Sequence, residues 1–405
     1  MLFEKLEERG FVYQTTDKEK VKDMINNQKV TFYYGVDPTA DSLHIGHCMS
    51  FFLIRQLQKA GHTPIIVFGG ATALIGDPTG KSEMRKMIDE QTVLKNIENI
   101  KKLVKKFLYE DETHKIIFEN NLDWFKGYDY VNFMRDIGVH FNVNKMLTTD
   151  AFTRRMETGG LTFLEMGYML MQAYDFLYLN RKYGCKLEVG GSDQWANILA
   201  GAELGRKVNF LDGKDQDAFQ GLTIPLLVNA DGIKMGKTEK GAVWVDETKT
   251  SPLDFYQYFY NIDDRDCEKL FKLMTELSLN DISELINNDI REAKHRLAYE
   301  ITAIVHGKDE AEKAQQTAKQ MFSGNNFENA PEYIQTQYPI NICELMKNCG
   351  LANSTSEARR LISQGGVSVN GEKLTDFNLQ VTQQLVGEGY IIKKGKKSFI
   401  KVVKG

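Results

Sequence analysis

The first 230 residues alternate between short apolar segments and longer segments with helical spacing, and this alternation restricts the fold most. Segment 30–36 is rich in β-branched and aromatic residues and ends at Asp37-Pro38, a turn signal. Segment 45–60 has apolar residues at helical spacing and ends at Gly61. Further strands are predicted at 64–68, 116–118, 186–189 and 223–228, and further helices at 92–107 and 162–183. The alternation predicts an α/β fold with a doubly wound parallel sheet.

The length of 405 residues predicts two or three domains. After residue 228 no strand is predicted until the tail, and Ser251-Pro252 is a helix start signal. The predicted organisation is a catalytic α/β domain at 1–230, a loop linker at 231–250, an α-helical domain at 251–325, a linker at 326–340 and a small α+β domain at 341–405. In the last segment, Asn370-Gly371 predicts a hairpin turn.

Composition excludes several classes of protein. The chain is 42% hydrophobic and 26% charged, which is typical of globular domains. No apolar run approaches the roughly 18 residues of a membrane span, and residues 1–9 mix both charge signs, unlike a secretion or transit signal. The five cysteines are scattered without a C-x-x-C pair, so we expect neither a disulfide framework nor a metal site, and we expect a reducing cytoplasm.

Charge is divided unevenly along the chain. Residues 341–405 contain ten Lys and Arg against five Asp and Glu, a net +5, which leaves −9 for residues 1–340. A basic tail on an acidic body favours an anion-binding module, although a solvated lysine-rich surface gives the same composition.

The strongest local motif follows the first predicted strand. Residues 37–47 read Asp-Pro-Thr-Ala-Asp-Ser-Leu-His-Ile-Gly-His, and a helix begins within them. A helix N-terminus presents free N–H groups to an anion, two imidazoles add donors, and Gly46 lets a ligand approach closely. The alternative is a polar helix cap without a ligand, which the combination of strand, turn and H-I-G-H disfavours.

A second motif, Lys234-Met235-Gly236-Lys237-Thr238, follows the last predicted strand. Its two ammonium groups and hydroxyl suit a loop that neutralises charge on departing pyrophosphate. Alone, such a stretch is common surface sequence. Together and in this order, the two motifs resemble the signature motifs of class I aminoacyl-tRNA synthetases.

The intervening residues resemble those of bacterial tyrosyl-tRNA synthetases, from about Phe32 to the C-terminus. The resemblance implies a Rossmann-like catalytic domain, ATP with Mg²⁺, L-tyrosine and tRNA(Tyr) as substrates, and a homodimer. Two positions depart from the family pattern. Gly236 stands where the class signature has serine, and Tyr34 stands where some relatives have a ribose-contacting cysteine.

One predicted helix supports tyrosine recognition by its spacing. Tyr168, Gln172 and Asp175 lie at i, i+4 and i+7, within about 60° of one another on a helix. Such a polar stripe in an apolar segment needs partners, which a ligand or a hydrogen-bonded core network would supply.

The resemblance assigns roles to further residues. Tyr33 and Asp175 would contact the phenol hydroxyl, Tyr168, Gln172 and Asp77 the α-ammonium, and Gln194 the carboxylate. Thr39 and His44 would meet the γ-phosphate side, with Lys81, Arg85, Lys234, Lys237 and Thr238 closing over the phosphates. Asp37, Gly46 and His47 would lie at the nucleotide, and Asp193 would accept bonds from the ribose. For Asp193 a helix N-cap, and for Lys81 and Arg85 surface ion pairs, are the alternatives.

The tail from about Ile342 to Val402 resembles the S4 RNA-binding module. The expected RNA-binding residues are Arg359, Arg360, Lys393, Lys394, Lys396 and Lys397. The motifs are also compatible with three other functions: a tryptophanyl-tRNA synthetase, a small nucleotidyltransferase, and an RNA-binding regulator without catalysis. The Tyr33/Asp175 pair and the tail disfavour the first, and the intact motifs disfavour the last.

Overall fold

The computed structural model describes residues 1–79, 88–238, 241–323, 332–387, 390–395 and 398–405, without the side chains of 237–238 and 320–323. The chain divides into two compact units, Met1–Ala311 and Glu312–Gly405, and the division falls inside helix α16 (Lys308–Ser323). The helical segment expected as a separate domain is therefore joined, up to residue 311, to the unit that contains the large sheet. No helix in the described part of the chain is long and apolar enough to span a membrane.

Unit 1 is built on a six-stranded sheet in the order β1-β6-β5-β2-β3-β4. The strands are β1 (Gln14–Thr15), β2 (Thr31–Val36), β3 (Thr63–Phe68), β4 (Ile117–Asn120), β5 (Leu187–Gly191) and β6 (Gln220–Ile224). Strands β2 to β6 pair in parallel, as the alternation predicts. Strand β1 was not predicted and pairs antiparallel with β6, so the sheet is mixed.

The sixth strand is shorter than predicted. It ends at Ile224, before Pro225, although apolar residues continue to Val228. Residues 227 and 228 pair instead with the second motif: Met235 N–H donates to the Leu227 carbonyl over 2.8 Å, and Val228 bridges Lys234. The apolar run therefore has two roles, because its second half holds the motif beside the sheet.

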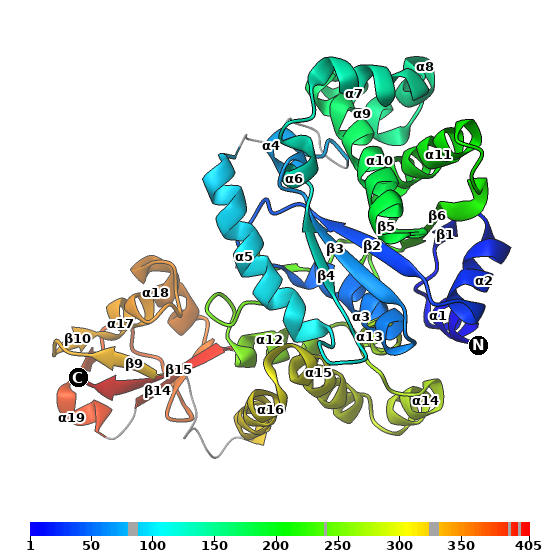
Figure 1. Cartoon of the computed structure of the whole chain (residues 1–405). Coiled ribbons are helices and arrows are strands. Elements are labelled where there is room, and N and C mark those ends of the chain that lie inside the picture. The colour runs from blue at the N-terminus through cyan, green and yellow to red at the C-terminus, as the bar shows by residue number, and fades with distance from the viewer. Residues whose placement is uncertain (80–87, 239–240, 324–331, 388–389, 396–397) are drawn as a thin grey trace. The chain divides into compact units, whose positions relative to one another are not determined.

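Helices cover both faces of the sheet (Figure 1). Helices α10 (Phe163–Tyr183) and α11 (Trp195–Leu211) lie on one face, and α3 (Ile45–Lys59) and α13 (Asp264–Met274) lie on the other. The other helices before residue 252 are α1 (Leu2–Arg9), α2 (Lys18–Asn27), α4 (Thr72–Ile75), α5 (Glu90–Phe107), α6 (Leu122–Phe125), α7 (Tyr130–Asp136), α8 (Val143–Leu147) and α9 (Asp150–Thr158). After the second motif, α12 (Pro252–Tyr260), α13, α14 (Leu279–Asn288) and α15 (Ile290–His306) follow, which confirms the predicted helical segment.

Strand order reverses between β2 and β5. The chain runs from β2 outward through β3 to β4, then returns to place β5 on the other side of β2. At such a reversal the loops after two neighbouring parallel strands leave in opposite directions, which opens a crevice at their carboxyl ends. The first motif follows β2, and Gly190-Gly191-Ser192-Asp193-Gln194 ends β5 and follows it. The fold thus brings both segments to the crevice.

Unit 2 contains a five-stranded sheet in the order β12-β11-β14-β15-β9. Its strands are β9 (Glu332–Gln335), β11 (Val367–Val369), β12 (Glu372–Lys373), β14 (Tyr390–Lys394) and β15 (Ser398–Lys404), with β10 (Ile340–Asn341) paired to β13 (Gln380–Val381) and helices α17 (Ile342–Asn348), α18 (Thr355–Ser363) and α19 (Gln383–Val386). Strand β9 lies within the stretch 326–340 expected as a linker, yet it pairs in parallel with β15. The predicted hairpin is present, since Asn370 and Gly371 have positive φ values of 50° and 91° between β11 and β12.

Close packing of α11 predicts a measurable effect at Gly205. A Cβ on Gly205 would lie 2.4 Å from the buried Phe219 ring, whereas a Cβ on Gly167 in α10 would meet nothing within 4 Å. We expect Gly205→Ala to lower the free energy of unfolding by about 1–3 kcal/mol, because the Phe219 ring must move. Gly167→Ala is the control and should raise it by up to about 1 kcal/mol through helix propensity. Urea denaturation compares the two, and equal effects would contradict the tight contact.

Candidate active site

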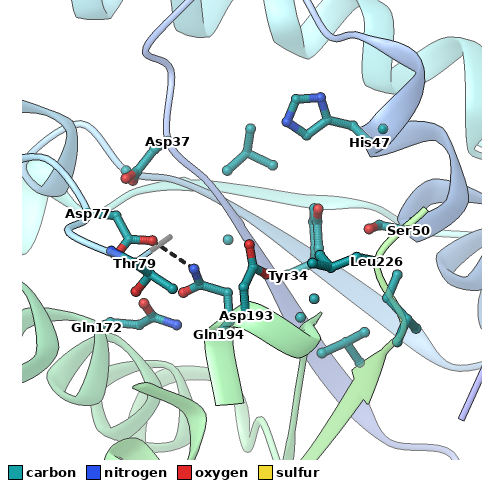
Figure 2. A pocket seen from close by; sticks show the side chains of 18 of the residues that line it. Tyr34, Asp37, His47, Ser50, Asp77, Thr79, Gln172, Asp193, Gln194 and Leu226 are labelled. Carbon is teal, nitrogen blue, oxygen red and sulfur yellow. Dashed lines mark hydrogen bonds between the residues drawn. The ribbon is translucent and has the colours of Figure 1, made fainter. Parts of the chain in front are cut away.

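A cavity of about 530 Å³ opens at the carboxyl edge of the sheet, where the order reverses. It is lined by the loops that follow the parallel strands and by one side of α10 (Figure 2). Its size suits a small-molecule ligand. In Figure 2, Tyr34, His47 and Ser50 lie toward one end, and Asp37, Asp77 and Gln172 lie toward the other.

Strand alternation divides the cavity. Tyr33 packs with Phe176 in the core beneath α10 and α11, with ring centroids 5.4 Å apart. Its neighbour Tyr34 packs against Phe51 of α3 at 5.6 Å. Because successive side chains of a strand point to opposite faces, one dipeptide contributes to both ends of the cavity. Burial raises the pKa of Tyr34 to about 12, against a smaller opposing effect of Ser50.

At the α10 end, Asp175 is buried and already has partners. Its Oδ1 accepts from the Trp124 indole N–H over 2.9 Å, and its Oδ2 accepts from the Asn121 amide over 3.1 Å. Desolvation nevertheless raises the pKa of Asp175 well above its usual range. Asn121 and Trp124 were missed by the sequence analysis, because nothing local marks them as partners of a residue about 50 positions away.

Asp37 and Asp77 are hydrogen-bonded to other residues predicted for the site. Tyr168 donates its hydroxyl to Asp37 Oδ2 over 2.9 Å. Asp77 Oδ2 accepts from the Gln194 amide over 2.7 Å, as the dashed line in Figure 2 shows. Six residues are expected around the amino acid, and hydrogen bonds hold the side chains of five of them in the cavity wall: Asp77, Tyr168, Gln172, Asp175 and Gln194. The sixth is Tyr33.

One buried carboxylate was not predicted as a site residue. Glu188 lies on β5, lines the cavity and is 2% exposed. Its Oε1 accepts from the Gln172 amide over 2.9 Å. Glu188 Oε2 and Tyr33 Oη form no hydrogen bond of normal geometry among the described residues, yet the two groups are close enough that Tyr33 lowers the pKa of Glu188 and Glu188 raises that of Tyr33. Burial raises the pKa of Glu188 to about 7. The signal was available, because a charged residue inside the apolar strand Leu187-Glu188-Val189 is exceptional.

The two histidines of the first motif form a capping box at the start of α3. His44 Nδ1 accepts from Gly46 N–H over 3.1 Å, and His47 Nδ1 accepts from His44 N–H over 3.3 Å. The polar cap considered as an alternative is thus present, and both residues also line the cavity. Burial, followed by the influence of His44, lowers the pKa of His47 to about 3, so His47 is neutral at pH 7. With Nδ1 as acceptor, its proton lies on Nε2.

The second motif meets the first one directly. Ile45 N–H donates to the Val243 carbonyl over 3.1 Å, and Val243 N–H donates to the Gly236 carbonyl over 2.9 Å. A Cβ on Gly236 would lie 3.3 Å from Ile45 and 3.5 Å from the Gly46 nitrogen. Gly236 also has φ 111°, a conformation that side chains disfavour. Both facts favour glycine at this position, where the class signature has serine.

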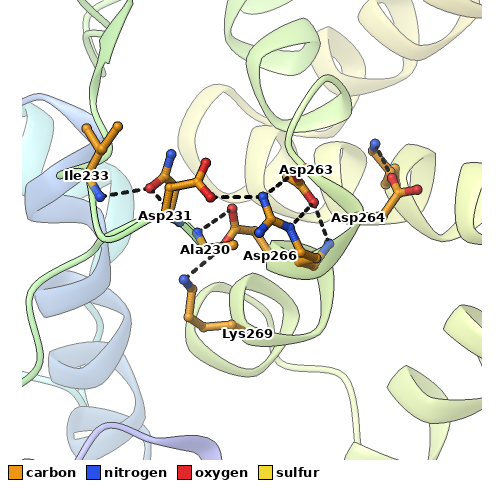
Figure 3. Close-up of polar contacts among 10 residues, drawn as sticks. Ala230, Asp231, Ile233, Asp263, Asp264, Asp266 and Lys269 are labelled. Atoms are coloured by element: carbon orange, nitrogen blue, oxygen red, sulfur yellow. Dashed lines mark hydrogen bonds and ion pairs between the residues drawn. The ribbon is translucent and has the colours of Figure 1, made fainter.

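The base of the second motif is anchored to α13 (Figure 3). Asp266 Oδ2 accepts from Ala230 N–H over 3.1 Å, and Asp266 Oδ1 pairs with Lys269 at 2.8 Å. Arg265 pairs with Asp231 at 3.1 Å. These contacts fix residues 230–231, from which the motif extends to the cavity.

Of the other residues predicted to contact the phosphates, some line the cavity and the rest lie outside the described part of the chain. Lys234 is exposed and lines the cavity, where its charge partly offsets the burial that raises the pKa of Asp193. Thr39 lines the cavity as well. Lys81 and Arg85 lie outside the described residues, as do the side chains of Lys237 and Thr238, whose backbone forms β7 (Lys237–Thr238) with β8 (Gly241–Ala242).

In unit 2, the predicted RNA-binding residues do not share one face. Arg359 and Arg360 are exposed on α18. Lys394 pairs with Glu357 of α18 at 3.2 Å, whereas its neighbour Lys393 points to the opposite face of β14 by strand alternation. Lys396 and Lys397 lie outside the described residues.

Comparison with known proteins extends over the whole chain. Residues 25–323 match the family of tRNA synthetases class I (W and Y), and residues 323–402 match the Tyrosine--tRNA ligase SYY-like C-terminal domain. The tyrosine--tRNA ligase of Clostridium kluyveri is 48% identical over 410 residues, with 99% of each chain covered. That of Clostridium tetani is 47% identical, with 99% of this chain and 98% of the relative covered.

Solved structures agree. A C-terminally truncated mitochondrial tyrosyl-tRNA synthetase from Aspergillus nidulans superposes with a TM-score of 0.72 at 31% identity, over 79% of this chain and 94% of that chain. A tryptophanyl-tRNA synthetase from Encephalitozoon cuniculi shares the fold, with a TM-score of 0.55 at 16% identity over 77% of this chain and 87% of that chain. The resemblance drawn from the sequence is confirmed: the chain belongs to the class I tRNA synthetases of the W and Y family and ends in the domain typical of tyrosine--tRNA ligases.

Proposed function

We propose that this chain activates L-tyrosine with ATP to tyrosyl-adenylate and pyrophosphate, and then transfers tyrosine to the 3′ end of tRNA(Tyr). The main support is the meeting of the two motifs beside a cavity whose other end holds the buried carboxylate Asp175. The full-length relatives named tyrosine--tRNA ligase support the same activity.

Amino-acid selectivity follows from the α10 end of the cavity. Tyrosine would place its phenol hydroxyl between Tyr33 and Asp175. Phenylalanine has no hydroxyl, so it would leave the buried Tyr33 hydroxyl without a partner and would offer no donor to Asp175, which is costly. Tyrosine-specific enzymes of this class are themselves the standard example, with about 10⁵-fold rejection of phenylalanine without editing. Tyr168, Gln172 and Asp77 would accept hydrogen bonds from the α-ammonium. Gln194 would orient the carboxylate.

Chemistry would take place between the two ends. The tyrosine carboxylate attacks the α-phosphorus of ATP, its oxygen forms the new P–O bond, and the bond to pyrophosphate breaks. A carboxylate is a nucleophile at pH 7, so no general base is needed and catalysis is positioning with charge stabilisation. Thr39, His44, Lys81, Arg85 and the Lys234, Lys237 and Thr238 groups of the second motif would contact the phosphates. Asp37, Gly46, His47 and Asp193 would contact the nucleoside. Mg²⁺ would enter with ATP as part of that substrate.

The experiment that tests the activity is ATP–pyrophosphate exchange with each amino acid separately. We expect exchange with tyrosine and none above background with tryptophan or phenylalanine. Combining Thr39→Ala with His44→Asn should lower single-turnover adenylate formation at least tenfold while tyrosine affinity changes less than twofold, since these residues lie at the phosphate end. Asparagine retains the helix cap that His44 supplies, so loss of folding is avoided. Exchange with tryptophan alone would refute the tyrosine assignment.

The tail is proposed to bind tRNA through its cationic residues. Because β9 pairs with β15, we expect truncation after Ser323 to remove the tail as a unit and to abolish charging while tyrosine activation persists. Arg359→Ala with Arg360→Ala in the full chain should weaken charging and reduce its salt dependence, because fewer phosphates are neutralised. Charging retained by the truncated chain at physiological salt would contradict the RNA-binding role.

A homodimer is proposed from the exposed apolar side chains of residues 130–164. Helices α7, α8 and α9 lie together at one end of unit 1 (Figure 1). Seven large hydrophobic side chains are exposed there and at the start of α10: Tyr130, Val131, Val139, Val143, Met156, Phe163 and Leu164. Exposed apolar residues gathered in one stretch are typical of an interface.

The five cysteines, all free and buried, fit the cytoplasmic location that we also propose.

Light scattering tests this interface with two matched phenylalanines. Phe163 and Phe210, at the end of α11, are each 68% exposed. We expect Phe163→Asp to shift the chain to a monomer and Phe210→Asp to leave the dimer intact, because only Phe163 belongs to the proposed interface. A monomeric unaltered chain at all concentrations would overturn the proposal.

A further inference from the structure

Glu188 occupies a central position beneath the cavity. It lies directly opposite Tyr33 of β2 and Gly221 of β6 in the sheet. The side chains of Glu188 and Tyr33 therefore share the face covered by α10 and α11. Helix α11 presents Gly201 to the carboxylate, and a Cβ there would lie 3.2 Å from Glu188 Oε2. The glycine thus leaves room for the carboxylate, which is 2% exposed at the wall of the cavity.

The hydrogen bond between Glu188 and Gln172 determines which way the Gln172 amide faces. Glu188 Oε1 accepts from Gln172 Nε2 over 2.9 Å. An ionised carboxylate has no proton to donate, so only the NH₂ side of an amide can face it. The Gln172 carbonyl oxygen must then point away, and this buried atom has no hydrogen-bond partner among the described residues. A buried acceptor without a partner is costly unless a ligand supplies a donor.

We propose that Glu188 is a positioning residue for the amino-acid substrate, holding the Gln172 amide so that its carbonyl oxygen accepts a hydrogen bond from the α-ammonium of tyrosine. This inference rests on the proposed function and adds a residue to which neither motif points. A neutral glutamine at position 188 can either donate or accept, so it leaves the Gln172 amide free to turn either way.

The orientation of Gln172 depends on the charge of Glu188 and hence on pH. The titratable groups that face Glu188 are Tyr33 on β2, Asp175 on α10 and Cys185 just before β5, and α11 and β6 face it with glycines. Burial raises the pKa of Glu188 to about 7. Above pH 7 the carboxylate only accepts, and below pH 7 the protonated form can donate and no longer selects the amide orientation. We therefore expect tyrosine binding to weaken as pH falls through 7.

Binding of three ligands to Glu188→Gln separates this role from others. L-Tyrosine and tyramine carry the ammonium group, whereas 3-(4-hydroxyphenyl)propanoate has the same phenol without it. At pH 8 we expect Kd to rise about tenfold for the two ammonium ligands, the size of one hydrogen bond to a charged group, and less than twofold for the propanoate. Equal weakening of all three ligands, or no weakening of any, would overturn the proposal.

Two controls complete the design. Glu119→Gln makes the same chemical change on β4, where Glu119 pairs with Lys182 outside the cavity, and should leave all three affinities unchanged. In the unaltered chain, affinity for tyrosine relative to the propanoate should fall severalfold between pH 8 and pH 6, and Glu188→Gln should remove this dependence. A pH-independent ratio in the unaltered chain would overturn the proposal even if the variant does not fold.

Absence of ATP–pyrophosphate exchange with tyrosine in the unaltered chain would refute the proposed function. Normal exchange in the unaltered chain together with unchanged tyramine affinity in Glu188→Gln would refute only the role of Glu188.

Discussion

The structure depends on keeping several carboxylates buried at the edge of a parallel sheet. Asp175 and Glu188 are buried, and the partly buried Asp37 acts on Asp175 through its negative charge. Burial raises the pKa of both Asp175 and Glu188. Burying a carboxylate is costly unless hydrogen bonds compensate. Asp175 has two donors from the segment after β4, Asp37 has Tyr168 and Thr72, and Glu188 has Gln172. Much of the cavity wall therefore consists of hydrogen-bond donors around these carboxylates. Among the described residues, the α10 end of the cavity has no cationic side chain, so the ammonium group of a substrate would supply the positive charge there.

Much of this site was predictable because its residues follow recognisable local patterns. Strand-helix alternation predicts the sheet, and the carboxyl ends of its strands predict where ligands bind. The stripe of Tyr168, Gln172 and Asp175 follows from helical spacing alone, and all three residues line the cavity. The two explanations of that stripe, a ligand site and a core network, do not exclude each other. Asp175 has core partners and also faces the cavity.

What was not predictable depends on contacts between distant residues. The partners of Asp175 come from a segment with no motif of its own, and β1 pairs with β6 across about 200 residues. Strand β9 was mistaken for linker because its four residues Glu332-Tyr333-Ile334-Gln335 gain their stability from β15 rather than from local propensity. Lys393 and Lys394 look equivalent in sequence, yet strand alternation gives them opposite faces. Among the described residues, an ion pair is present for Lys394, with Glu357, and none for Lys393. Composition gives the number of charged side chains in the tail, but it does not give the face of the strand on which each one lies.

Alternation along β2 also separates the two ends of the cavity. Tyr33 and Tyr34 are adjacent in sequence, but Tyr33 joins the acidic end under α10 and Tyr34 joins the end formed by α3 and its histidines. A substitution at one end therefore needs no rearrangement of the other, because the strand backbone between them stays paired to β3 and β5. Tyrosine in place of a smaller residue at position 34 is accommodated on the α3 side without disturbing the Asp175 end. On the proposed function, the same separation would let Glu188, on the Tyr33 side, adjust amino-acid binding without moving the groups proposed to face the phosphates.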